Sequence, residues 1–299
     1  MARVPALVLT LALTAAACGG ESGQSASSAA ESGGFPRTVQ GVVIPEEPES
    51  IVSTSASHTE ILYAIGAGSA VKATDTFSDH PAAAKATEKI DAFNVNVEAV
   101  ATLEPDLVIL AFDPGDVTEG LAALGIPTLL FDAPGNIGDA YAQIETVGAA
   151  TGHEAEAAEL VAAMESDIDQ ILADLPIPTA PWSYFYELDP TGFSVSSETF
   201  VGSLLGMLGM SSIADAAGEP FPQLAAEFVI DANPDFVLLA DTKCCGASLV
   251  TLGDRPGWDA LTAVASGSVI ELDDDIASRW GPRLVDLIRT VAGEVYGAP

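Results

Sequence analysis

A fourteen-residue segment occurs twice in this chain, once in each half. Residues 98–111 align without gaps to residues 227–240, and seven of the fourteen positions are identical. Each copy begins with Glu, passes through a Pro-Asp turn and ends in an apolar run typical of strands buried in parallel sheets. The repeat therefore predicts two lobes of related α/β architecture rather than one continuous domain.

Two helical patterns lie between the two copies. Apolar residues recur at spacings of three and four over residues 137–147 and again over residues 160–175, so that each segment has one apolar face. Pro176 and Pro178 then end the pattern. The second segment, residues 153–175, would be about 35 Å long at about 1.5 Å per residue. We predict that it is a long helix that joins the two lobes.

The charge of the chain excludes one class of partner. The 43 Asp and Glu residues outnumber 10 Lys and Arg residues, for a net charge of -33. Binding to nucleic acid depends on Lys and Arg at phosphates, so nucleic acid is not expected as a partner. Five of the few cations fall between residues 243 and 289. Each either meets an anionic group of a ligand or pairs with nearby acids, and the composition leaves both open.

The N-terminus has the features of an export signal. An apolar run from Val4 to Ala17 follows one early cation and is too short to span a bilayer. It ends in Ala-Ala-Ala-Cys18, which resembles the bacterial lipobox, so we expect Cys18 to be lipidated; cleavage of a soluble signal near it is the alternative. Residues 19–34 contain no large apolar side chain and predict a flexible tether. The predicted organisation is a signal peptide at 1–17, a lipidated Cys and tether at 18–47, an N-terminal lobe at 48–135, a helical linker at 136–178 and a C-terminal lobe at 179–299.

A possible ligand site follows the first predicted strand, residues 51–55. Ser57 and Glu60 fit a capping box at the start of a helix, with Ser57 as N-cap. A strand, a polar turn and a helix N-terminus in this order place Ser57 and His58 at the carboxyl end of a strand, where open α/β sheets bind ligands.

These motifs resemble the substrate-binding proteins of iron-siderophore and vitamin B12 ABC importers. The resemblance extends from residue 48 to residue 296 and is carried by residues 51–68, Ser78-Asp79-His80-Pro81, Val97-Glu98 and Pro105-Asp106-Leu107-Val108, in this order. It implies an α/β protein of the class III periplasmic binding type, with two Rossmann-like lobes joined by a single long helix. It also implies a ligand held in the cleft, no enzymatic activity and no cofactor.

The resemblance and the predicted loops together suggest the ligand contacts. We expect aromatic and polar side chains from both lobes to face the ligand, namely Ser57, His58, His80, Phe93, Tyr186, Phe193, Phe221, Arg279 and Trp280. Flat rings suit a large planar ligand. Phe221-Pro222-Gln223 resembles a segment of vitamin B12 binders, although His80 stands where those binders have Tyr. A corrinoid is therefore the favoured ligand, followed by a ferric siderophore or haem.

The resemblance also implies partners outside the ligand site. Glu98 and Glu227 match the two glutamates, one per lobe, that dock such proteins on arginines of a permease dimer. The implied partner is that permease dimer with its ATPase subunits. Alternatively, each acid only stabilises the first turn of a helix. We expect a monomeric, exported protein at the outer face of the cytoplasmic membrane, held there by a lipid anchor alone.

Two further observations bear on chemistry. Cys244 and Cys245 are adjacent, and an exported protein allows a vicinal disulfide between them, with reactive thiols or metal ligation as alternatives. The three histidines do not have metal-site spacing, so a metal site is not expected.

An exported α/β hydrolase is an alternative function, but residues 192–196 lack the last Gly of a G-x-S-x-G elbow. A tethered ligand sensor without a transporter is the other alternative.

Overall fold

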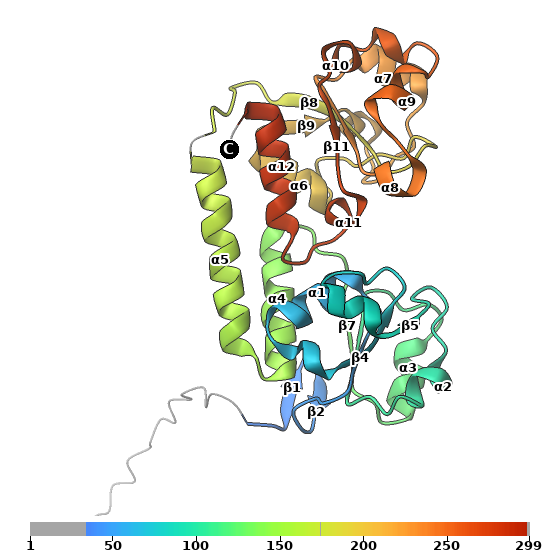
Figure 1. Ribbon diagram of the computed structural model, residues 1–299, viewed down its shortest axis with the longest axis vertical. Coiled ribbons are helices and arrows are strands. Elements are labelled where there is room, and N and C mark those ends of the chain that lie inside the picture. Colours follow the sequence, from blue (N-terminus) through green and yellow to red (C-terminus); the bar gives the residue numbers. More distant parts are fainter. Residues whose placement is uncertain (1–33, 174, 298–299) are drawn as a thin grey trace, which may run out of the picture. The chain divides into compact units, whose positions relative to one another are not determined.

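The computed structural model describes residues 34–173 and 175–297, which form two parallel β-sheets with helices around them (Figure 1). The predicted signal peptide, Cys18 and most of the predicted tether lie outside the described residues. None of the helices that the structure describes is long and apolar enough to cross a membrane.

The first lobe contains a five-stranded sheet in the order β5-β4-β3-β6-β7, with every neighbouring pair parallel. Its strands are β3 (Ile51–Ser53), β4 (Val71–Asp75), β5 (Glu88–Ile90), β6 (Leu107–Leu110) and β7 (Thr128–Leu130). The surrounding helices are α1 (Ala56–Ala64), η1 (Ala67–Ala70), η2 (Ala82–Ala86), α2 (Val97–Ala101) and α3 (Val117–Ala123). The strand β6 is buried along its whole length, as its unbroken apolar sequence predicts.

The second lobe contains a four-stranded parallel sheet in the order β11-β10-β8-β9. Its strands are β8 (Trp182–Glu187), β9 (Met210–Ser212), β10 (Phe236–Leu239) and β11 (Val269–Glu271). Its helices are α6 (Phe200–Met207), η3 (Ile213–Ala217), α7 (Ala226–Ala232), α8 (Thr242–Cys245), α9 (Leu249–Gly253), η4 (Trp258–Ala260), α10 (Thr262–Ser266), α11 (Asp274–Ala277) and α12 (Leu284–Tyr296).

The two sheets share one strand order. The series β4-β3-β6-β7 corresponds to β9-β8-β10-β11, and β5 is an additional edge strand of the first lobe. The repeated segment forms α2 and β6 in one lobe and α7 and β10 in the other. The prediction of two related α/β lobes is therefore confirmed, and the repeat marks the equivalent strand in each.

The Pro-Asp pair of the repeat has the same task in both lobes. The Asp106 carboxylate accepts hydrogen bonds from the backbone N–H groups of Glu49 and Ser50 (both 2.9 Å), just before β3. Asp235 accepts from the backbone N–H (2.8 Å) and the hydroxyl (2.7 Å) of Ser183 in β8. Each Asp therefore ties the repeated strand to its central neighbour, which explains why the repeat retains this residue.

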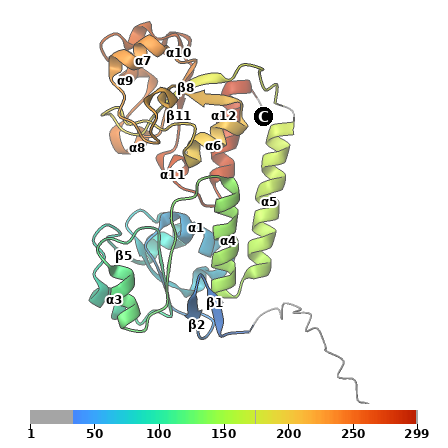
Figure 2. The same cartoon turned by 180° about the vertical axis from the view of Figure 1, so that it is seen from behind.

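Two helices follow one another between the lobes, as the two apolar periods predict. They are α4 (Ile137–Thr151), which ends at Gly152 in the left-handed conformation (φ 79°), and α5 (Glu154–Ala173). Figures 1 and 2 show them side by side, and α5 packs on α4 and on α12 of the second lobe. A Cβ atom added at Gly148 would lie 2.5 Å from the Cβ of Ala157, so the close approach of the two helices requires glycine there. The predicted long connecting helix is α5.

The last part of the predicted tether is folded instead of flexible. An antiparallel hairpin of β1 (Arg37–Val39) and β2 (Val42–Ile44) lies within residues 18–47. Ile44 is fully buried, and β1 packs on α4. The available signal for this hairpin was a pair of β-branched runs, 38–39 and 42–44, separated by the two-residue turn Gln40-Gly41.

Candidate functional site

A cleft of about 720 Å³ lies between the carboxyl ends of the strands of both sheets. In each sheet the order reverses next to the first strand, between β3 and β6 and between β8 and β10. Loops leave in opposite directions at such a point and open a crevice, where open α/β sheets bind ligands. The cleft is lined at both reversal points, by residues 54–57 after β3 and by Leu188 and Ala240 after β8 and β10.

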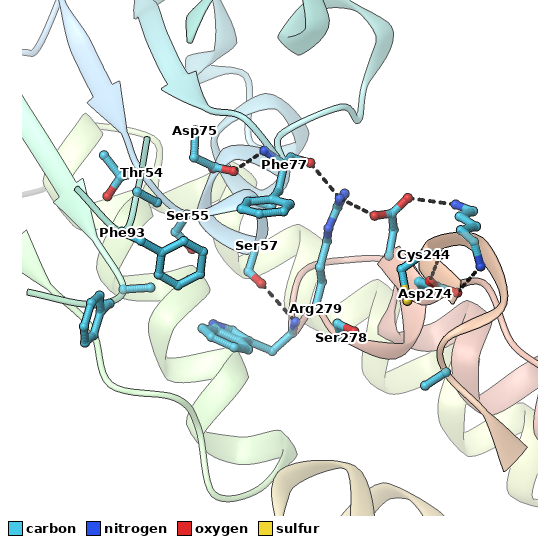
Figure 3. Close-up of a pocket in the computed structure, with 18 of the residues that line it drawn as sticks. Thr54, Ser55, Ser57, Asp75, Phe77, Phe93, Cys244, Asp274, Ser278 and Arg279 are labelled. Atoms are coloured by element: carbon cyan, nitrogen blue, oxygen red, sulfur yellow. Dashed lines mark hydrogen bonds and ion pairs between the residues drawn. The ribbon is translucent and has the colours of Figure 1, made fainter. Parts of the chain in front are cut away.

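One wall of the cleft consists of exposed aromatic rings. Phe77, Phe93 and Phe112 follow β4, β5 and β6, and they are 56, 68 and 56 % exposed. The ring centroids of Phe77 and Phe93 are 6.0 Å apart, and those of Phe93 and Phe112 are 6.3 Å apart. Buried Asp75 holds this wall in place, because its carboxylate accepts from the Phe77 N–H at 2.6 Å (Figure 3). Phe93 was predicted; Phe77 and Phe112 were not, although both directly follow predicted strands.

The opposite wall is polar and comes from α8 and α11. Lys243, Asp274 and Asp275 line it. The Nζ of Lys243 lies 2.6 Å from Asp273 and 2.7 Å from Asp275, so its charge is already paired. Asp274 accepts from the backbone N–H groups of Lys243 (2.9 Å) and Cys244 (2.8 Å), which holds α8 against the cleft.

Arg279 connects the two lobes and is not a free receptor for an anionic group. Its side chain is buried, and its Nη1 donates to Glu60 (2.8 Å) and Asp79 (3.0 Å) of the first lobe. Its Nη2 donates to the Phe77 carbonyl (2.7 Å) and to Asp275 (2.7 Å). Although burial lowers its pKa, the hydrogen bonds to Glu60 and Asp79 raise that pKa overall. The expected contact of Arg279 with a ligand anion is replaced by these four bonds.

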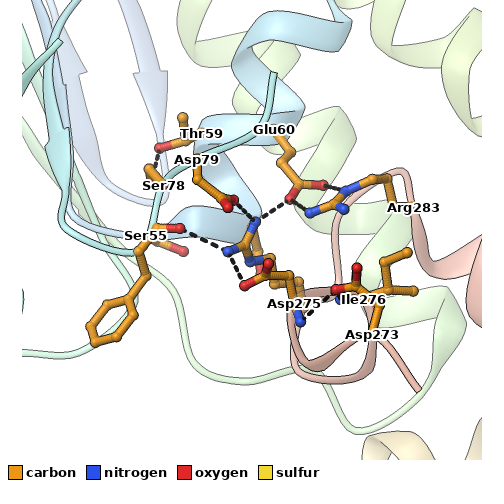
Figure 4. Close-up of polar contacts among 12 residues, drawn as sticks. Ser55, Thr59, Glu60, Ser78, Asp79, Asp273, Asp275, Ile276 and Arg283 are labelled. Atoms are coloured by element: carbon orange, nitrogen blue, oxygen red, sulfur yellow. Dashed lines mark hydrogen bonds and ion pairs between the residues drawn. The ribbon is translucent and has the colours of Figure 1, made fainter. Parts of the chain in front are cut away.

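Glu60 is the centre of this inter-lobe network, shown in Figure 4. Its buried carboxylate also accepts from the Nε (3.0 Å) and Nη2 (2.6 Å) of Arg283, at the start of α12. Between the two arginines, Gly281 lies so close to α1 that a Cβ atom there would be 3.1 Å from the Ser57 carbonyl oxygen. The loop 279–283 is therefore docked on α1 by both charge and shape.

The helix cap predicted at Ser57 is formed two residues earlier in the chain. Ser55 is the N-cap of α1, and its hydroxyl accepts from the His58 N–H. Ser57 instead lines the cleft and accepts from the Trp280 N–H at 3.1 Å. Glu60 does not cap, because the arginines occupy its carboxylate. The S-x-x-E pattern matched the capping box, but a tertiary ion pair competes more strongly for the carboxylate.

His58 lies behind the cleft wall rather than in it. It is fully buried, with its ring centroid 4.3 Å from that of Phe131. Gln143 donates to the Asp132 carbonyl, so its Oε1 accepts from the indole N–H of Trp280 (2.9 Å) and from Nε2 of His58 (3.1 Å). Nδ1 of His58 consequently accepts from the Ser55 hydroxyl (2.8 Å). Burial lowers the pKa of His58 to about 4, so the ring is neutral and orients Trp280 through Gln143.

Of the nine predicted ligand contacts, the structure brings Ser57, Phe93, Arg279 and Trp280 together along the cleft. The other five lie elsewhere. His58 is buried behind Trp280, His80 lines a separate small hollow beside Glu60, and Tyr186 is fully buried with its hydroxyl donating to the Ala277 carbonyl (3.3 Å). Phe193 and Phe221 are exposed outside the cleft. Sequence alone does not show which face of a loop an aromatic side chain occupies.

A pair of buried carboxylates lies beneath the second-lobe side of the cleft. Glu187 forms a bidentate ion pair with Arg255 (2.6 and 2.7 Å). Asp241 is fully buried, and neither oxygen of its carboxylate has a hydrogen-bond partner among the described residues. Burial and the neighbouring charge of Glu187 raise the pKa of Asp241 to about 7. Asp241 therefore holds a proton below this pH.

We expect the substitution Asp241→Asn to stabilise the protein above pH 7. Because the pKa of Asp241 is higher in the folded state than its ordinary value of 3.8, the stability that its proton contributes is fully present below pH 3.8 and is lost as the pH rises through about 7. Asn has no proton to lose, so at pH 8.5 the gain should be on the order of 1–3 kcal/mol. Urea denaturation at several pH values measures this.

The free energy of unfolding of the variant must be compared with that of the wild type at each pH, because the titration of His58 changes stability with pH in the opposite direction. Its pKa is lowered from 6.5, so its contribution to stability is lost as the pH falls from 6.5 to about 4. This effect is common to both proteins and cancels in the difference. A constant difference between pH 5 and 8.5 would show that Asp241 does not titrate in this range.

Two sequence predictions concern the thiols and metal binding near the cleft. Cys244 and Cys245 are free, exposed thiols in α8, so the predicted vicinal disulfide is not formed in this structure; Cys244 lines the cleft. Over residues 34–173 and 175–297, no group of three or more His, Cys, Asp or Glu side chains is placed to hold a metal ion.

Comparison with known proteins gives a consistent result. The model of the family described as periplasmic binding protein matches residues 51–276. An uncharacterized ABC transporter substrate-binding lipoprotein, YvrC of Bacillus subtilis, is 32% identical over 99% of this chain and 97% of its own. The vitamin B12-binding protein of Pectobacterium atrosepticum is 28% identical over 80% of this chain and 85% of its own.

Among solved structures, the periplasmic heme-binding protein RhuT from Roseiflexus sp. RS-1 matches with a TM-score of 0.75 and 25% identity, over 83% of this chain and 98% of that chain. The two related parallel sheets, the cleft at their carboxyl ends and the family match lead to one conclusion: the chain belongs to the periplasmic binding protein family.

Proposed function

We propose that this protein is the substrate-binding component of an ABC importer and that its ligand is a corrinoid, bound in the cleft between the two lobes. The observation that carries the choice of ligand is the pairing of an aromatic wall with an acidic wall. Phe77, Phe93 and Phe112 offer apolar area to a broad ring system.

The charges of the cleft distinguish among the three candidate ligands, a corrinoid, haem and a ferric siderophore. The lining carboxylates are Asp75, Asp274 and Asp275, while Lys243 and Arg279 are engaged in ion pairs. A ligand with several exposed anionic groups, such as haem with its propionates or a ferric catecholate, would face repulsion without a free cation to offset it. The amide groups around a corrin ring are neutral donors that suit carboxylate acceptors.

Fluorescence titration tests the proposed ligand, because Trp280 lies in the cleft. We expect saturable one-to-one quenching by cyanocobalamin and weaker binding of haemin and of a ferric catecholate siderophore. Tighter binding of either anionic chelate would reject the corrinoid and retain the transport function. No binding of any of the three would reject the proposed cargo class.

The docking role of Glu98 and Glu227 is supported by their position. Each is exposed in the first turn of its helix, α2 or α7, and neither makes an ion pair with another described residue. In α/β units the helix that precedes a strand begins at the carboxyl edge of the sheet, which is the edge that borders the cleft. This position supports the proposal that both carboxylates meet arginines of a permease dimer on either side of the cleft mouth.

We expect the double substitution Glu98→Ala and Glu227→Ala to abolish uptake while leaving ligand affinity unchanged, because neither side chain lines the cleft. Uptake of labelled cobalamin by cells that express the permease measures the first effect, and titration of the purified protein measures the second. Glu159→Ala, at an exposed position of α5, is the matched control. Normal uptake by the double variant would contradict docking through these residues.

The localisation that fits this function is the outer face of the cytoplasmic membrane, with Cys18 as the lipidated residue.

The alternative function, a hydrolase, has one feature in its favour, since the Ser55 hydroxyl lies 2.8 Å from Nδ1 of His58. However, a pKa of about 4 makes His58 a poor general base, and Gln143 occupies the place of a triad carboxylate. Ester turnover that is lost on Ser55→Ala would reverse this choice.

A further inference from the structure

The backbone at the start of the helix α8 is held in the cleft wall by the carboxylate of Asp274, which follows β11. Asp274 accepts from the Thr242 hydroxyl (2.9 Å) and from the backbone N–H groups of Lys243 and Cys244. Figure 3 shows Asp274 and Cys244 next to each other at the cleft. Asp274 also begins α11, whose end leads to Ser278 and Arg279 in the same cleft. The backbone of α8 therefore determines where part of the polar wall lies.

Two adjacent thiols occupy this helix. Both Cys244 and Cys245 are exposed, and only Cys244 lines the cleft. Their Cα atoms are about 3.8 Å apart across a trans peptide, below the usual disulfide range of about 4.4–6.8 Å. A bond between the two sulfur atoms would force the peptide between them out of helical geometry. It would break the hydrogen bond from the Cys245 N–H to the Asp241 carbonyl (3.1 Å) and release the Cys244 N–H from Asp274.

We propose that Cys244 and Cys245 are a modification site that forms a reversible vicinal disulfide by exchange with an external disulfide, and that closing this ring weakens ligand binding in the cleft. The second part rests on the proposed function. Strained and exposed disulfides are the easily reduced, regulatory ones, so the ring opens again when thiols are available.

The exchange balances in two steps. The Cys245 thiolate attacks one sulfur of the external disulfide, one thiol leaves, and a mixed disulfide remains on Cys245. Cys244 then loses its proton to solvent and attacks the Cys245 sulfur, which releases the second thiol. Two cysteine thiols are oxidised and one external disulfide is reduced. Hydrogen bonding to Cys245 raises the pKa of Cys244 to about 12, so Cys244 does not make the first attack, and this hydrogen bond is lost once the Cys245 sulfur is in the mixed disulfide.

The test for ring formation needs no ligand. The full-length protein is incubated with glutathione disulfide, free thiols are blocked with N-ethylmaleimide, and the peptide that contains both cysteines is weighed. We expect that peptide to be lighter by two hydrogen atoms and unlabelled, and dithiothreitol to restore both labels. In Cys244→Ser the ring cannot form, and only a glutathione adduct on Cys245 is expected. Two labelled thiols or a stable glutathione adduct in the wild type would overturn the proposal.

The effect on the cleft has two independent measurements. Amide hydrogen exchange of α8 should become faster in the ring form, because the bond from Cys244 to Asp274 is lost. The affinity for cyanocobalamin should fall about tenfold or more, as expected for lost hydrogen bonds to a charged group. Unchanged exchange and affinity in a protein that forms the ring would overturn the effect on the cleft. If the reduced protein does not bind cobalamin, the proposed ligand is rejected. The peptide mass and the hydrogen exchange of α8 still test whether the disulfide forms and whether it changes the helix.

Discussion

The substitution Glu60→Ala is expected to destabilise the protein by about 3–5 kcal/mol, because it leaves charged groups buried without their partner. Glu60 is buried on α1 and accepts three hydrogen bonds from Arg279 and Arg283 of the second lobe. Arg279 keeps Asp79 and Asp275, whereas Arg283 loses its carboxylate. Urea denaturation measures the loss in the free energy of unfolding. The m value of the variant is compared with that of the wild type, because a lost contact between the lobes can also change how cooperatively they unfold.

Two controls separate charge from shape and from helix propensity. Glu60→Gln keeps the length and one acceptor oxygen, so we expect a smaller loss than for Ala. Glu159→Ala removes an exposed glutamate from α5 and should change the free energy of unfolding by less than about 0.5 kcal/mol. If Glu60→Ala is no more harmful than Glu159→Ala, the network does not hold the lobes together.

The second large effect concerns binding. The triple substitution of Phe77, Phe93 and Phe112 by Ala is expected to weaken cobalamin binding by about a thousandfold or more, because each covered ring contributes about 1.5–3 kcal/mol. The rings are exposed without ligand, so stability should change little. Titration of Trp280 fluorescence and urea denaturation of the same preparation measure both quantities.

The matched control for this wall is the double substitution of Phe193 and Phe221 by Ala. Both rings are exposed like those of the wall, but neither lines the cleft. We expect the affinity for cobalamin to stay the same. If the double variant loses binding and the triple variant keeps it, the ligand lies at the segment that resembles vitamin B12 binders rather than in this cleft.

The fold was predictable to the level of strand and lobe because its signals are local. The Pro-Asp repeat located β6 and β10, and the period of apolar residues located α4 and α5. Elements without a local signal were missed. The strand β5 consists of Glu88, Lys89 and Ile90, which is not a strand-like composition, and it exists because the neighbouring β4 supplies its hydrogen bonds.

The binding site was predictable only in part, because it depends on contacts between distant residues. Glu60 and Arg283 are 223 positions apart, and no spacing rule relates them. The position of Tyr186 in β8 indicated a sheet end near the cleft, but a parallel strand is covered on both faces and its ring is buried in the core. The aromatic wall was found only once the loops after β4, β5 and β6 were in place.

By itself, the sequence determined the two related α/β lobes, the long connecting helix and the family, because repeats, apolar periods and ordered motifs are written along the chain. Only the tertiary structure decided that Arg279 joins the lobes, that His58 supports Trp280 from behind, and that Phe77 and Phe112 face the cleft. The physical reason is competition: a side chain takes the strongest partner that the folded chain brings near, and that partner is set by packing rather than by spacing in the sequence.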